Sequence, residues 1–136
     1  MAKQLTIIRH AKSSWENPNC EDHGRPLNKR GLRDAPEMGV RLAKRDWLPN
    51  LFLVSAAKRA RDTAALIAGK VGYAEERIVF DDRLYLAEPG EWRSVIGALP
   101  AEAAHVACIG HNPGITELAN HFSDEYIDNV PTCGLI

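Results

Sequence analysis

The sequence is poor in cysteine, and the few cysteines it has are not spaced as a disulfide framework. Its 136 residues include three, Cys20, Cys108 and Cys133, and no CxxC pair. A small disulfide-stabilised domain carries an even and denser set, whereas sparse cysteines are typical of a reducing compartment. We therefore expect a cytoplasmic protein in which Cys108, inside an apolar segment, is a buried and unreactive thiol.

Long hydrophobic runs and an excess of one charge are missing as well. The apolar run nearest the start, LTII, has four residues, far fewer than a signal-peptide core, and no segment approaches the length of a membrane span. The 17 basic and 18 acidic residues give a net charge of −1, so no overall field attracts nucleic acid or an anionic membrane. We expect neither as a partner.

What the chain does contain is a regular alternation of short apolar segments with amphipathic ones. This alternation predicts one α/β domain over residues 1–136, a three-layer α/β/α sandwich with a mainly parallel central sheet. The predicted strands cover residues 5–8, 51–54, 77–80 and 105–109, and the predicted helices cover 28–46, 58–69, 92–99 and 113–122. The last residues, VPTCGLI, are expected to begin a further strand.

The first predicted helix has a clear start and one disturbance. Asn28 is placed to cap its amino end, and Pro36 should kink or split it. Apolar residues three to four apart define the face expected to point inward: Leu32, Ala35, Met38 and Leu42. The strand at 77–80 is the weakest of the four and is expected near an edge of the sheet.

Polar clusters follow three of the predicted strands. Arg9-His10 ends the first, Ser55 with Lys58 and Arg59 follows the second, and Gly110-His111-Asn112 follows the fourth. In a parallel α/β sheet, ligands bind at the carboxyl ends of the strands, so these clusters should meet. Guanidinium groups and the free N–H groups of a helix start at residues 112–114 would suit a phosphoryl group.

A histidine in such a setting can act as a nucleophile. A neutral imidazole attacks phosphorus and forms a phosphohistidine, which divides one difficult displacement into two easier ones. Arginines, and a second histidine if it is protonated, would stabilise the charge that develops on the phosphoryl oxygens.

The motifs together resemble the histidine phosphatase superfamily, whose fold is that of phosphoglycerate mutase. The resemblance covers nearly the whole chain and is strongest to the small SixA-type phosphohistidine phosphatases. The segments that carry it are RHAKSSW, RPLNKRG, SAAKRARDT and GHNPG, in this order. It implies that His10 is the phosphorylated nucleophile, that Arg9, Arg59 and His111 bind the phosphoryl group, and that no metal or other cofactor is needed. It also implies a C-terminal strand region that this chain lacks.

Three positions depart from the family pattern. Ala11 replaces a glycine after the histidine, and Ala56 stands where many members have proline; neither should change the chemistry. Leu86 lies near the position where phosphoglycerate mutases and many acid phosphatases carry an acidic proton donor, and Glu88 is close but out of register. The missing acid disfavours alkyl phosphate esters, whose alkoxide leaving groups need a proton, and favours phosphohistidine or a similarly labile group.

Several residues have simpler alternative explanations. Arg59 could be an ordinary surface arginine like Arg61, and only the family register selects it. Ser13 and Arg25 are candidates for substrate binding: the resemblance implies a hydroxyl residue near the phosphate at Ser13, and Arg25 lies in a loop that could close over the pocket. Tryptophans at 15, 47 and 92 are expected to be packing residues. A metal site built from His10, His111 and Asp22 or Asp82 is disfavoured, because no metal-ligand motif is present and Arg9 would repel a cation.

Two classes of function remain open. The first is a metal-independent phosphohydrolase acting through a phosphohistidine on His10, with a phosphorylated partner, such as a phosphohistidine-bearing protein, or a small phosphorylated metabolite as substrate. The second is a phosphoryl-binding or scaffold module that has lost turnover together with its acid. A mutase is disfavoured because the chain is short and lacks that acid.

Overall fold

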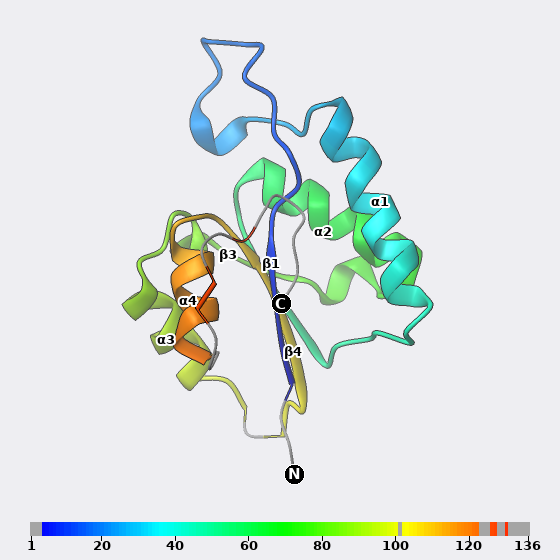
Figure 1. Cartoon of the computed structure of the whole chain (residues 1–136), viewed down its shortest axis with the longest axis vertical. Coiled ribbons are helices and arrows are strands. Elements are labelled where there is room, and N and C mark those ends of the chain that lie inside the picture. The colour runs from blue at the N-terminus through cyan, green and yellow to red at the C-terminus, as the bar shows by residue number, and fades with distance from the viewer. Residues whose placement is uncertain (1–3, 101, 123–125, 128–129, 131–136) are drawn as a thin grey trace.

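The computed structural model describes residues 4–100, 102–122, 126–127 and 130. Four parallel strands form its central sheet in the order β1-β4-β2-β3 (Figure 1). The strands are β1 Gln4–Arg9, β2 Leu51–Ser55, β3 Val79–Asp81 and β4 His105–Gly110. The predicted parallel sheet is confirmed, and β3 lies at its edge as expected.

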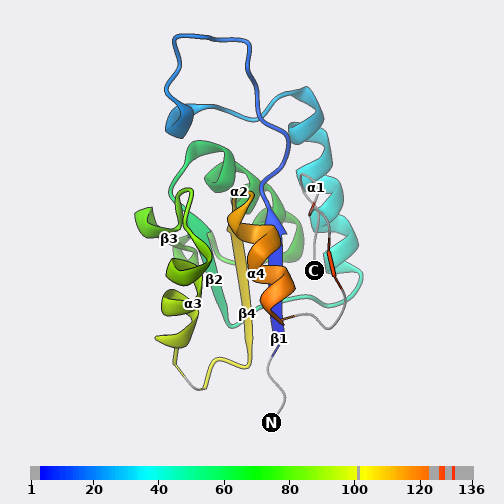
Figure 2. The ribbon, with the colours of Figure 1, turned by 60° about the vertical axis from the view of Figure 1, so that its left-hand side comes forward.

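Helices cover both faces of the sheet, as the predicted sandwich requires (Figure 2). On one face lie α1 Lys29–Ala43 and α2 Lys58–Val71, and on the other lie α3 Pro89–Gly97 and α4 Gly114–Phe122. Because side chains alternate along a strand, β4 serves both layers. Its Ala107 and Ile109 belong to the first core, whereas Val106 and Cys108 belong to the second.

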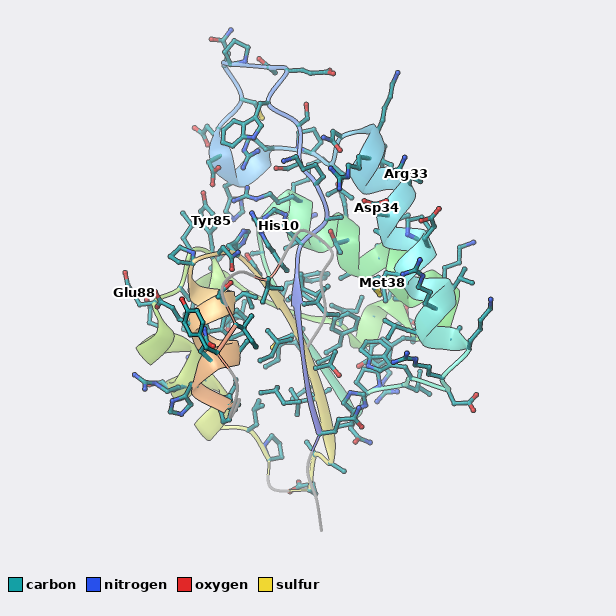
Figure 3. The ribbon with its side chains drawn as sticks, viewed as in Figure 1. His10, Arg33, Asp34, Met38, Tyr85 and Glu88 are labelled. Atoms are coloured by element: carbon teal, nitrogen blue, oxygen red, sulfur yellow. The ribbon has the colours of Figure 1, made fainter. Side chains whose placement is uncertain are left out.

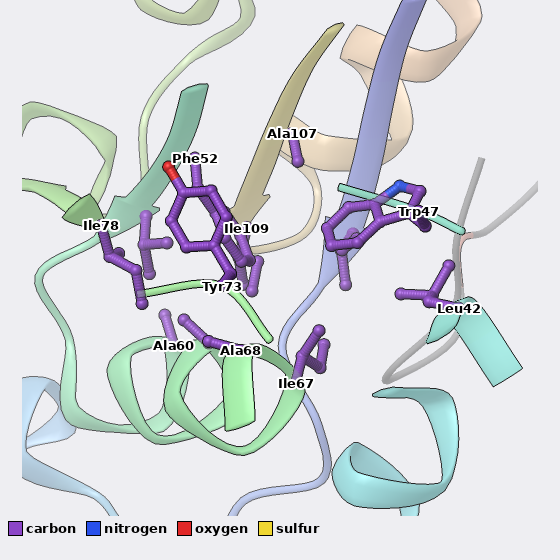
Figure 4. Close-up of a cluster of buried hydrophobic side chains, with 13 residues drawn as sticks. Leu42, Trp47, Phe52, Ala60, Ile67, Ala68, Tyr73, Ile78, Ala107 and Ile109 are labelled. Atoms are coloured by element: carbon purple, nitrogen blue, oxygen red, sulfur yellow. The ribbon is translucent and has the colours of Figure 1, made fainter. Parts of the chain in front are cut away.

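Figure 4 shows the core between the sheet and the first helix pair. Phe52 from β2 and Ile67 from α2 are fully buried in it. Trp47, from the connection after α1, packs edge-on against Phe52 and donates its indole N–H to Thr6 of β1 over 3.2 Å. These contacts fix α1 and α2 against the sheet and so fix where the loops above them begin.

The first helix begins where predicted and differs from prediction along its length. The Asn28 side chain accepts the backbone N–H of Gly31 and caps the helix. Pro36 does not split it, because the carbonyl left without a donor is that of Leu32, on a face open to water. The prediction that Leu32 points inward is wrong: it is 54% exposed. The buried residues of this helix are Gly31, Ala35, Gly39 and Leu42.

Other boundaries shift by a few residues. β3 starts at Val79 because the residues before it, Glu75–Arg77, form a 3₁₀ turn, and two further 3₁₀ turns cover Asp22–Gly24 and Asp82–Leu84. Helix α3 starts at Pro89, three residues before the prediction. Of the tail expected to form a strand, only Val130 lies within the described residues. None of the described helices is long and apolar enough to span a membrane.

Candidate active site

A cavity of about 230 Å³ lies at the carboxyl ends of β1 and β4, next to the start of α2. All six residues predicted as catalytic or substrate-binding line it. Its lining consists of Arg9, His10, Lys12, Ser13, Trp15, Asp22, Arg25, Arg59, Leu86, His111 and Asn112. The structure therefore brings together segments that are up to 103 residues apart in sequence, from Arg9 to Asn112.

Strand pairing places the first histidine beside the second. Arg9, the last residue of β1, pairs with Gly110, the last residue of β4, and the His10 N–H donates to the Gly110 carbonyl over 3.2 Å. His111 follows directly, so the two imidazole rings lie with their centroids 5.0 Å apart. A side chain on Gly110 would collide with Trp92, which is why glycine suits this junction.

The His10 ring is held in one tautomer. Its Nδ1 lies 2.7 Å from the carbonyl oxygen of Ala11, which can only accept, so Nδ1 carries the proton and Nε2 has a free lone pair. Burial, supported by the charges of Arg59 and Arg9, outweighs this hydrogen bond and lowers the pKa of His10 to about 4. The ring is therefore neutral at pH 7. The Ala11 N–H in turn donates to Thr63 Oγ1, which donates to the Arg59 carbonyl.

His111 is fixed from the opposite side by Ser55, the buried last residue of β2. Its Nε2 lies 2.8 Å from Ser55 Oγ, and its buried Nδ1 has no hydrogen-bond partner among the described residues. Burial, then the neighbouring His10 and Arg59, lowers the pKa of His111 to about 3. In this arrangement His111 is neutral, not the cation that the sequence analysis considered.

Two arginines contribute further unsatisfied donors. The Nε atoms of Arg9 and Arg59 are buried and have no partner among the described residues, although Arg9 also donates through Nη1 to the Val130 carbonyl. Burial lowers the pKa of Arg9 but leaves a guanidinium charged at neutral pH. Arg9, Arg59 and His111 all line the cavity, and the two guanidinium charges there suit a bound anion.

Ser13 and Arg25 belong to this site and are linked to each other. Arg25 donates through Nη1 to Ser13 Oγ over 2.6 Å, and both side chains are buried. The Trp15 ring lies 3.5 Å from the Arg25 guanidinium carbon. Trp15, expected to be a packing residue, is instead 73% exposed at the cavity rim, because its partner is the flat face of a guanidinium.

Asp22 and Tyr85 are the residues that sequence reasoning missed. Asp22 was considered only as a metal ligand, yet its carboxylate binds Arg59 over 3.0 Å and Arg25 over 3.1 Å. The Tyr85 hydroxyl donates to the same carboxylate, and the Tyr85 ring meets the His111 ring edge-on at 5.5 Å. Figure 3 shows Tyr85 and His10 at the same end of the sheet. The sequence signal that could have indicated this ion pair is the i,i+3 spacing of Asp22 and Arg25.

Leu86, which the family resemblance places near an expected acidic proton donor, presents an apolar side chain to the cavity. Leu86 is 56% exposed at the cavity rim and has a left-handed backbone with φ of 51°. Glu88 does not line this cavity; it is the N-cap of α3 and forms a capping box with Glu91. Two backbone N–H groups at the start of α4 already have hydrogen-bond partners. The N–H of Ile115 donates to the His111 carbonyl, and that of Thr116 donates to the side-chain oxygen of Asn112.

A larger cavity of about 690 Å³ lies at the other end of the sheet, beside Gln4 and Leu5 of β1. Its described lining is apolar apart from Gln4 and contains no titratable side chain, so it offers no comparable chemistry. Within the part of the chain that the structure describes, no group of three or more His, Cys, Asp or Glu residues is placed to hold a metal ion.

Comparison with known proteins identifies relatives of this fold and site. The family model described as histidine phosphatase superfamily, branch 1, matches residues 5–111. An uncharacterized chloroplastic protein of Arabidopsis thaliana is 33% identical over 141 residues, an alignment that covers 98% of this chain. The chain spans 64% of that protein's length.

Two solved structures share the architecture. A candidate phosphohistidine phosphatase SixA from Agrobacterium tumefaciens superposes with a TM-score of 0.90 at 29% identity, covering 99% of this chain and 90% of its own. The protein histidine phosphatase SixA complexed with tungstate gives a TM-score of 0.85 at 22% identity, covering 96% of this chain and 83% of its own. The second, at this identity, shows the fold alone.

Proposed function

The chain belongs to the histidine phosphatase superfamily, branch 1, and from this premise we propose that it is a phosphatase whose nucleophile is His10. The observation that carries the proposal is the state of that ring: neutral, with Nδ1–H bound to the Ala11 carbonyl and the Nε2 lone pair free. The match to the family model includes His10 and His111.

The surrounding groups supply what a phosphoryl transfer needs. A phosphoryl dianion in the cavity would be bound by Arg9 and Arg59, whose buried Nε–H groups have no hydrogen-bond partner among the described residues. When Ser55 donates to His111 Nε2, the His111 proton lies on Nδ1 and offers a third donor. These donors are fixed before the substrate arrives, so they stabilise the equatorial oxygens in the transition state without reorganising.

The reaction then proceeds in two steps. His10 Nε2 forms a bond to phosphorus while the bond to the leaving group breaks, giving a phosphohistidine on His10. Water attacks this phosphorus in the second step, and the N–P bond breaks with its electron pair returning to Nε2. Because Nδ1 keeps its proton throughout, the ring leaves as neutral imidazole in the second step and needs no added acid.

The substrate class follows from the leaving-group side of the pocket. Leu86 cannot protonate an alkoxide, so a group that leaves without strong acid assistance is favoured. Phosphohistidine on a partner protein fits this requirement, and the SixA phosphatases that share this fold support it. The structural observation that favours the second candidate, a phosphoryl-binding module without turnover, is the same apolar Leu86.

The decisive experiment is to trap the intermediate. Wild-type protein mixed with phosphoimidazole and quenched in base should carry acid-labile, base-stable phosphate, whereas His10→Ala should carry none and lose at least about 1,000-fold in kcat. His121→Ala, at an exposed position on α4, is the matched control and should behave as wild type. We expect the activity to persist in a metal chelator. A wild type that binds phosphate but forms no phosphoenzyme would support the binding module.

A further inference from the structure

Resting on the proposed function, we infer that Asp22 is the residue that recognises the leaving group, and that it selects nitrogen leaving groups bearing an N–H over oxygen leaving groups. The starting point is that the cavity does contain a carboxylate, although position 86 lacks one. It comes from a different segment, the 3₁₀ turn Asp22–Gly24 above the sheet, and lines the same cavity as His10.

The carboxylate is fixed in place by three donors. Arg25 Nε donates to Oδ1, while Arg59 Nη2 and the Tyr85 hydroxyl donate to Oδ2. Arg59 Nη1 also donates to the Asp22 backbone carbonyl over 2.6 Å. The two arginine side chains are 9% and 3% exposed, but that of Asp22 is 42% exposed. Its anchors are therefore buried, and the carboxylate itself remains accessible at the cavity.

The carboxylate is ionised and acts only as an acceptor. Burial would raise the pKa of Asp22, but hydrogen bonds from Tyr85 and Arg59 and the Arg59 charge outweigh it and lower this pKa to about 2. Such a group cannot protonate an alkoxide, and it repels a departing oxyanion. It can accept a charge-assisted hydrogen bond from an N–H, which neither Leu86 nor any arginine in the lining can do.

A phosphorylated imidazole presents that N–H when its second ring nitrogen takes a proton from solvent. His10 Nε2 bonds to phosphorus, the P–N bond of the substrate breaks with its electron pair going to nitrogen, and the ring departs as neutral imidazole that keeps its N–H. The step is symmetrical between two imidazoles. The Ala11 carbonyl accepts the distal N–H of the His10 ring, and Asp22 accepts that of the leaving ring.

The test compares two aromatic leaving groups in one variant. For Asp22→Asn, which keeps the shape and loses the charge, kcat/KM for phosphoimidazole should fall on the order of 10- to 100-fold, the size of a hydrogen bond to a charged group. For para-nitrophenyl phosphate it should stay the same or rise. Asp82→Asn is the matched control: its carboxylate, 90% exposed, lies outside the cavity, so both rates should remain at wild-type values.

A second measurement needs no variant. With inorganic phosphate bound, imidazole should inhibit the wild type more strongly at pH 6 than at pH 8, because the carboxylate attracts the imidazolium form, whereas inhibition by phenol should not change. Equal losses for both substrates in Asp22→Asn, or imidazole inhibition that ignores pH, would overturn the role of Asp22 while leaving a trapped phosphoenzyme, and so the proposed function, intact. Failure to trap any phosphoenzyme would remove both.

Discussion

Single residues in this site are held in protonation states that folding imposes on them. His10 and His111 are 6% and 3% exposed, and burial is the largest cause of their lowered pKa values. A neutral His10 keeps the Nε2 lone pair that the proposed attack requires. A neutral His111, whose Nδ1 has no partner among the described residues, adds no charge beside the arginines. The same burial must then affect stability, because both rings are free to take up protons in the unfolded chain.

The stability of the protein should therefore fall between pH 7 and pH 5. The folded pKa values of about 4 and about 3 lie below the ordinary histidine value, so the unfolded state binds more protons in this window and stability rises with pH. Each histidine should contribute a loss of about 2 kcal/mol over these two pH units. Urea unfolding at pH 7 and pH 5 measures the loss.

The control for this prediction is His10→Asn. It removes one of the two titrating rings, so the free energy of unfolding should lose about 2 kcal/mol less than the wild type does over the same range. An unchanged pH dependence in the variant would mean that His10 does not carry a depressed pKa.

At the scale of elements, the contact between α1 and α2 decides how the loops above the sheet are held. Gly39 of α1 lies so close to α2 that a Cβ there would come within 2.7 Å of Lys70 Cβ and 3.2 Å of the Ile67 backbone. At Gly69 of α2, by contrast, a Cβ would meet no atom of the other described elements within 4 Å. Gly39 is therefore required by the close packing of the two helices. The main effect of Gly69 is instead to lower the helix propensity of α2.

Alanine at these two positions should change stability in opposite directions. Gly39→Ala should destabilise the protein by about 1–3 kcal/mol, because overpacking against α2 exceeds the gain in helix propensity. Gly69→Ala should stabilise it by up to about 1 kcal/mol, because only the propensity changes. Thermal or urea unfolding of both variants checks the pair, and a stabilised Gly39→Ala would show that the helices are not in close contact.

The elements themselves were predictable wherever a local signal decided them. The cap at Asn28 and the buried strands at residues 51–54 and 105–109 follow from residue type and hydrophobic pattern, and the structure confirms them. Leu32 was misplaced because small residues, Gly31 and Gly39, form the buried face of α1 and carry little hydrophobic signal. Periodicity finds large apolar residues, whereas close helix packing here depends on the absence of a side chain.

For the whole molecule, the sequence sufficed to predict the part of the site that the sheet assembles. Arg9, His10 and His111 follow strand ends, so the parallel topology alone brings them together. Asp22, Tyr85 and the Val130 carbonyl depend on how loops cross above the sheet, and no local pattern encodes that crossing. Arg59 was selected over Arg61 by family register, and the structure gives the physical reason: Arg59 is 2% exposed and lines the cavity, and Arg61 is exposed.

Because Arg59 lines the cavity and Arg61 does not, an anion bound there should stabilise the whole fold through Arg59. Inorganic phosphate at 100 times its dissociation constant should stabilise the wild type by about 2.7 kcal/mol, which raises Tm by about 9 °C for a chain of 136 residues. Arg59→Gln should lose most of this shift because it removes a buried donor, whereas Arg61→Gln, two residues along the same helix, should keep it. Thermal melts with and without phosphate measure each shift against that variant's own baseline. Equal shifts in the two variants would place the anion away from Arg59 and outside the cavity at the ends of β1 and β4.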